Sequence, residues 1–119
     1  MLGGEKQGMK GSVMNPLDKA ILDRFKALVS TRFQLHKVVL FGSRARGDAD
    51  PDSDLDVVVV LEDAADGGAE DYVSHCAWEA GFEHGVVVVP VVFTRHEWEY
   101  GPERQSLFVQ AVETEGVPV

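Results

Sequence analysis

The chain has 119 residues, which is enough to bury one hydrophobic core but not two. Hydrophobic residues make up 45% of it and its net charge is −9, so it has the composition of a globular protein and is a poor general binder of DNA or RNA backbones. Its apolar runs fall far short of the roughly 20 residues that a membrane-spanning helix needs, so no membrane association is expected.

Charge is distributed unevenly along the chain. Residues 1–46 carry nine Lys and Arg against three Asp and Glu, whereas residues 47–119 carry two against seventeen. The basic part allows a local anion site or a surface that faces a partner, although a plain solvated surface could show the same segregation. A single cysteine, Cys76, cannot form an internal disulfide, and no signal peptide is visible, so we expect a cytoplasmic protein.

The expected elements begin after a short leader. Residues 1–14 have the composition of a flexible leader, in which Met9 or Met14 could be the true start, and residues 15–119 are expected to form one domain. A helix is expected over about residues 16–32, because it opens on a capping Asn and a Pro at the first helical position. Its apolar residues fall at helical spacing: Leu17, Ala20, Ile21, Phe25, Leu28 and Val29.

Three strands and a second helix follow. Residues 37–41 and 55–61 are rich in β-branched residues and are expected to be strands, the second of them buried on both faces. Apolar residues at helical spacing over 72–80 predict a helix, and a third strand is expected over 86–93. Pro90 interrupts that strand and cannot donate to a ladder, which predicts a bulge or an edge position.

Two helices are expected to close the domain. Thr94 and Glu97 fit a capping box that starts a short helix, and a last helix is expected over residues 106–113. The residues of that last helix expected to face inward are Leu107, Phe108, Ala111 and Val112. The predicted fold class is therefore α/β, a small mixed β-sheet with helices packed on it.

A turn suited to binding phosphate follows the first expected strand. Gly42 ends the strand and Ser43 could open a short helix, so backbone N–H groups and the Ser43 hydroxyl would form an anion site. Arg44 and Arg46 could add positive charge to it. A P-loop is rejected because its lysine is missing, and a plain β-turn remains equally compatible with the Gly-Ser pair alone.

Five aspartates follow this turn at every second position: Asp48, Asp50, Asp52, Asp54 and Asp56. A calcium-binding EF-hand loop is improbable, because the places of its invariant Gly and bidentate Glu are held by Ser and Val. The last two aspartates begin the second strand and leave it on the same face, so they offer two hard oxygen ligands to Mg²⁺. A polar strand entrance is the alternative. The four histidines show no paired spacing for zinc.

These two motifs together resemble the signature of the polymerase-β-like nucleotidyltransferases, most closely the small prokaryotic minimal nucleotidyltransferase domains. The matching residues are Gly42-Ser43-Arg44-Ala45-Arg46-Gly47 and Ser53-Asp54-Leu55-Asp56, and the resemblance covers nearly the whole chain from about residue 16. It implies that Gly42 and Ser43 contact the phosphates of a nucleoside triphosphate, with ATP expected, and that Asp54 and Asp56 bind Mg²⁺ or Mn²⁺.

The same resemblance implies a reaction and a partner. A nucleotidyl group, AMP by expectation, would be transferred to a hydroxyl of a protein or of a small molecule. A domain of this size looks too small to carry its own acceptor-binding domain, so a separate helical partner protein is implied, as in toxin–antitoxin pairs.

One departure from the family pattern affects the expected activity. The family places a third carboxylate, a metal ligand and base, on the following strand, but residues 86–93 contain no Asp or Glu. Val87 or Val89 stands at the expected place, and Glu83 and His84 are the nearest substitutes in the sequence. An inactive or weakly active nucleotide-binding module of the antitoxin type is therefore the second hypothesis, and an unrelated structural α/β domain is the third.

Overall fold

The computed structural model describes residues 14–47, 53–63 and 67–119. Met14 packs against the core, while the rest of the predicted leader lies outside the described residues. In chain order the elements are α2 (Pro16–Ser30), β1 (Leu35–Phe41), α3 (Ser43–Arg46), β2 (Leu55–Leu61), α4 (Ala69–Phe82), β3 (Val88–Thr94), α5 (Arg95–Tyr100), the 3₁₀ helix η1 (Pro102–Gln105), α6 (Leu107–Glu115) and β4 (Val117–Pro118).

The described strands form one mixed sheet in the order β3-β2-β1-β4. β1 runs antiparallel to β2 and to β4, whereas β2 and β3 are parallel. The predicted fold class is confirmed, although the sequence did not predict β4. The register places Asp56 of β2 between Phe41 of β1 and Val89 of β3, which fixes what surrounds the predicted metal ligands.

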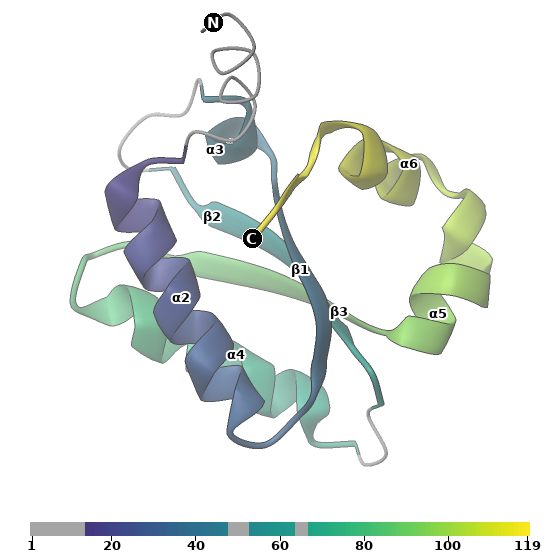
Figure 1. Ribbon diagram of the computed structural model, residues 1–119, viewed down its shortest axis with the longest axis horizontal. Helices are drawn as coiled ribbons and strands as arrows, with labels where there is room; N and C mark the ends of the chain where they lie inside the picture. The colour runs from purple at the N-terminus through teal and green to yellow at the C-terminus, as the bar shows by residue number, and fades with distance from the viewer. Residues whose placement is uncertain (1–13, 48–52, 64–66) are drawn as a thin grey trace, which may run out of the picture.

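Helices cover both faces of the sheet (Figure 1). α2 and α4 pack on one face, and α5 and α6 lie on the other. Successive residues of β2 point to these two layers in turn, so that Val57 and Val59 join the α2–α4 core while Val58 and Val60 join the α5–α6 core. The prediction of a strand buried on both faces is confirmed. No helix among the described residues is long and apolar enough to span a membrane.

Local capping fixes where two helices begin. The Asn15 side-chain oxygen accepts a hydrogen bond from the Leu17 backbone N–H at 2.7 Å, as a capping residue does. Thr94 and Glu97 form the predicted capping box at the start of α5. Both starts are confirmed, while α2 ends at Ser30, two residues before the expected end.

The inward face predicted for α6 is wrong in part. Val109 and Val112 are the buried residues of this helix, whereas Leu107 is 84% exposed and Phe108 and Ala111 are also exposed. Both sets of residues fit helical spacing, so the sequence alone did not determine which set faces the sheet. As a consequence, Phe108 is available at the surface beside the end of β1, where its ring meets that of Phe41.

β3 lies at the edge of the sheet and starts two residues later than expected. Pro90 occupies a regular position in its pairing with β2, where the register runs without a shift from Val88 to Thr94. The edge position predicted from Pro90 is therefore confirmed, and the alternative of a bulge is not needed.

Candidate functional site

The end of β1 and the start of β2 meet at Gly42 and Asp56. Phe41 pairs with Asp56 in the antiparallel ladder, and the chain then turns at Gly42 with φ +81° and ψ −159°. A Cβ atom added to Gly42 would lie only 2.9 Å from Oδ2 of Asp56. Only glycine combines this backbone conformation with so close an approach of a carboxylate. The structure thus brings the predicted phosphate turn and the predicted metal ligand together.

The predicted short helix at the turn is present as α3. It begins at Ser43, directly after Gly42, and the Gly42 carbonyl accepts hydrogen bonds from the backbone N–H groups of Ala45 at 3.1 Å and Arg46 at 3.2 Å. It ends at Gly47, which has a left-handed conformation with φ +82°. Ser43 is therefore placed at the start of this helical turn, one residue from the closest approach to Asp56. Its contact with phosphate stays a prediction.

Arg44 makes contacts that the sequence did not predict. Its Nη1 donates to Oδ1 of Asp18 at 2.6 Å, and its Nε and Nη2 donate to the Ser53 carbonyl at 3.0 and 2.7 Å. The side chains of Arg44 and Asp18 are only 8% and 5% exposed. Arg44 therefore joins α3 to the start of α2 and to the residue before Asp54, which gives it a positioning role. Its partner Asp18 gave no signal in the sequence beyond favouring the helix start.

Arg46 is exposed and lines a small pocket of about 150 Å³ beside the turn. The other residues around this pocket are Phe41, Gly42, Phe108, Ala111, Val112 and Glu115. The Phe41 and Phe108 rings meet edge to face, with centroids 5.3 Å apart and planes at 87°. Sequence reasoning missed Phe108 and Glu115 as site residues, because the last helix was expected to turn its large apolar residues inward.

Asp54, just before β2, and Asp56, within it, carry like charges without a third acidic ligand or a histidine or cysteine beside them among the described residues. Asp54 is exposed and Asp56 is half-buried, and burial, followed by repulsion from Asp54, raises the pKa of Asp56 above its ordinary value. Two carboxylate oxygens of this kind fit Mg²⁺, which proteins commonly bind through one or two carboxylates together with substrate phosphates. Within the described parts of the chain, no group of three His, Cys, Asp or Glu could hold a metal.

Valine side chains occupy the place where a third carboxylate was sought. Val89 is the register partner of Asp56, and the Val87 carbonyl accepts a hydrogen bond from the Leu55 N–H at 2.8 Å. Paired residues of neighbouring strands point to the same face, so Val87 and Val89 share the face of Asp54 and Asp56. They are 61% and 36% exposed, respectively. On the side of β3, the side chains beside the two aspartates are therefore apolar.

The substitutes considered for the third acid are not brought to the site. Glu83 and His84 lie in the turn after α4 and form no ligand group with Asp54 and Asp56. The remaining aspartates of the alternating run, Asp48, Asp50 and Asp52, lie outside the described residues.

Alanine at Gly42 is expected to destabilise the fold far more than alanine at Gly47. Both glycines have a φ near +80°, but only the Cβ at Gly42 would meet another atom, the Asp56 carboxylate. Gly42→Ala should therefore lose roughly 1–3 kcal/mol from backbone strain and more from the displaced carboxylate. Gly47→Ala, the matched control, should lose about 1 kcal/mol. Urea denaturation of both variants measures this difference, and equal losses would contradict the close approach.

Comparison with known proteins assigns the chain to a family. The sequence model described as the nucleotidyltransferase domain matches residues 22–108, which include the turn at Gly42 and both Asp54 and Asp56. The chain belongs to the nucleotidyltransferase domain family. The resemblance seen in the two motifs is thereby confirmed, and this family is one of enzymes that transfer nucleotidyl groups.

Two relatives of this nucleotidyltransferase domain come from Methanocaldococcus jannaschii, and each carries the name "putative protein adenylyltransferase". One is 28% identical over 101 residues, which cover 83% of this chain and 95% of the relative. The other is 36% identical over 77 residues, which cover 63% of this chain and 71% of the relative.

A solved structure supports the fold. A chain from a structure described as "Crystal structure of the toxin-antitoxin with AMP-PNP" superimposes with a TM-score of 0.57 at 22% identity. The match covers 85% of this nucleotidyltransferase domain and 70% of the other chain. At this identity the likeness establishes a shared fold.

Proposed function

We propose that this nucleotidyltransferase domain binds ATP with Mg²⁺, or Mn²⁺ in its place, and transfers AMP to a hydroxyl of a separate protein. The observation that carries the proposal is the approach of the Asp56 carboxylate to Gly42, because a carboxylate beside a turn suited to phosphate is what a cation bound to a triphosphate requires. The names of the two archaeal relatives support a protein as acceptor. The toxin–antitoxin complex with AMP-PNP supports an adenine nucleotide and a separate partner.

Different residues of the proposed site would bind different parts of the triphosphate and its cation. Gly42 and Ser43 offer backbone N–H groups and a hydroxyl to the phosphates, and the exposed Arg46 adds charge. Asp54 and Asp56 would hold the cation. When bound, the cation neutralises the charge of the triphosphate and of the leaving group. Arg44 acts through position, because its guanidinium is already bonded to Asp18 and to the Ser53 carbonyl.

The pocket beside the turn is where the nucleobase would lie. It adjoins Gly42, so a base attached through a ribose to phosphates at the turn is within its reach. The exposed ring of Phe108 suits stacking of a planar base.

The proposed reaction breaks one bond to phosphorus and forms another. The acceptor hydroxyl oxygen bonds to the α-phosphorus while the bond from that phosphorus to the α,β-bridging oxygen breaks, and pyrophosphate leaves. The hydroxyl proton has to pass to a base. In the described site Val87 and Val89 cannot accept it, so we expect transfer to be about 10²–10⁴-fold slower than with a positioned base.

The missing base also favours a second candidate function, a nucleotide-binding antitoxin-type module without turnover. The apolar face formed by Val87 and Val89 is the observation that supports it. The third hypothesis, an unrelated structural domain, is set aside by the family match. With ATP as donor and a buried, unpaired Cys76, we place either function in the cytoplasm.

Incubation with ATP labelled at the α-phosphate, Mg²⁺ and the expected partner protein, sought first as the product of the adjacent gene, separates the two candidates. We expect slow transfer of label to the partner protein, and no transfer from ATP labelled at the γ-phosphate, because that phosphate leaves with pyrophosphate. Retained ATP binding without any transfer would favour the antitoxin-type module. Loss of both ATP binding and transfer would contradict the proposed function.

A further inference from the structure

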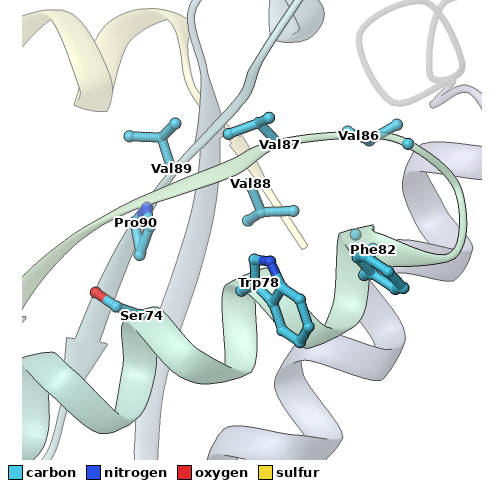
Figure 2. A pocket seen from close by; sticks show the side chains of 10 residues that line it. Ser74, Trp78, Phe82, Val86, Val87, Val88, Val89 and Pro90 are labelled. Carbon is cyan, nitrogen blue, oxygen red and sulfur yellow. The ribbon is translucent and has the colours of Figure 1, made fainter.

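An apolar groove of about 520 Å³ runs between α4 and the edge strand β3 (Figure 2). Its wall on α4 is formed by the exposed rings of Trp78 and Phe82, whose centroids lie 4.8 Å apart. On the other side of the groove, Figure 2 shows Val88 of β3 directed toward α4 and the preceding Val87 directed away from it. Large aromatic side chains gathered at one exposed place indicate an interaction surface rather than scattered surface residues.

The backbone along this groove has hydrogen-bonding groups to offer. β3 ends the sheet, and no other described strand pairs with its outer side. Because the Val87 carbonyl points to β2, the alternation of a strand directs the N–H and C=O groups of Val88 and Val92 outward. Pro90 occupies the outward position between them, where it interrupts the free edge without disturbing the pairing with β2. Such an edge can accept a further strand, but only a short one.

The charge around the groove indicates the chemistry of its partner. Residues 69–87 carry four carboxylates and no Lys or Arg. One of them, Glu79, accepts a hydrogen bond from Nη2 of Arg24 in α2 at 3.1 Å, whereas Glu83 is exposed beside Phe82. A segment that combines apolar residues with Lys or Arg would therefore complement this surface in both respects.

The groove is continuous with the face that carries the aspartates. Val87 and Val89 line the groove and also stand beside Asp54 and Asp56. In a strand added to β3, alternate side chains would contact the α4 aromatics, and those between them would point to the aspartate face. Two strand spacings, about 10 Å, would separate the added backbone from that of β2.

From these observations we infer that the acceptor protein docks by adding a short extended segment, with alternating apolar residues flanked by Lys or Arg, to the outer edge of β3. The inference rests on the proposed function, and it adds how the acceptor protein reaches the aspartate face. It also accounts for an apolar surface at Val87 and Val89, since these side chains belong to the docking surface.

A peptide titration followed by amide NMR tests this inference. The probe is a short peptide of alternating valine and threonine with lysine at both ends. We expect amide shifts along β3 and at Trp78, and binding about tenfold weaker in Trp78→Ala. Val92→Pro removes an outward N–H group, leaving a second position on this edge that, like Pro90, cannot donate. It should therefore also weaken binding. Tyr100→Ala, which removes an exposed aromatic ring outside the groove, should leave binding unchanged.

Several outcomes would overturn the inference. One is that the wild type does not bind the peptide, and another is that it binds equally well a peptide with glutamate in place of lysine. A third is that the amide shifts map to residues away from β3. Sedimentation that shows a dimer dissociated by Trp78→Ala would assign the groove to a second copy of the chain. Asp56→Asn should bind the peptide as the wild type does. Its loss of ATP binding would then test the proposed function, while peptide binding tests the docking surface independently.

Discussion

Val89→Asp is expected to raise adenylyl transfer by at least about tenfold, and by up to 10²–10⁴-fold if the new carboxylate serves fully as a base. Val89 is the register partner of Asp56, so its side chain is the one placed beside that aspartate. The position is partly exposed, so the added charge should cost less stability than one placed in the core. Turnover of α-labelled ATP with Mg²⁺ and the partner protein measures the gain.

Controls separate a chemical gain from a general effect at Val89. Val89→Asn has nearly the same shape without a charge and should give no gain. Val87→Asp lies beside Asp54, one position further along the same face, and should give a smaller one. Wild-type turnover at ordinary enzymatic rates, about 1–10³ s⁻¹, would instead show that another residue already provides the base.

Asp56→Asn is expected to abolish Mg²⁺-dependent binding of ATP while leaving the fold intact. Burial, and then repulsion from Asp54, raise the pKa of Asp56 above its ordinary value, so ionising this carboxyl costs more in the folded protein than in the unfolded chain. Removing that charge should leave the free energy of unfolding unchanged or raise it by up to about 1 kcal/mol. Calorimetry of ATP binding and urea denaturation measure the two effects.

The matched control for this variant is Asp63→Asn, which changes an exposed aspartate just beyond the opposite end of β2. It should leave Mg²⁺-dependent ATP binding as in the wild type. An unchanged affinity in Asp56→Asn would exclude the proposed cation site. Weak binding without Mg²⁺ in both variants would show how much the turn at Gly42 contributes alone.

Features fixed by neighbouring residues could be predicted from the sequence. The helix starts at Asn15 and at Thr94 depend on side chains that cap their own backbone, and both were predicted correctly. The buried strand β2 was also predicted with its bounds, because a run of β-branched residues this apolar has few alternatives. The meeting of Gly42 with Asp56 followed from the family resemblance.

Features fixed by distant residues could not be predicted. Asp18 lies in the first turn of α2, where the sequence indicates only that it favours the helix start, yet it is buried because Arg44, 26 positions later, folds back onto it. In α2, Leu17 is exposed and Leu22 is buried, although both positions fit helical spacing. The prediction of which face of α6 is buried was wrong in part for the same reason. Which face is buried depends on the packing partner, and the sequence of one helix does not contain that information.

The bonds from Arg44 to Asp18 and to the Ser53 carbonyl couple the site to α2, a helix that carries none of the residues proposed to bind the nucleotide or the cation. Occupancy of the turn by a ligand and the folding of α2 thereby become linked equilibria, so each favours the other. Under the proposed function, a nascent chain would gain affinity for ATP only after α2 has docked, and nucleotide binding would report that this helix is in place.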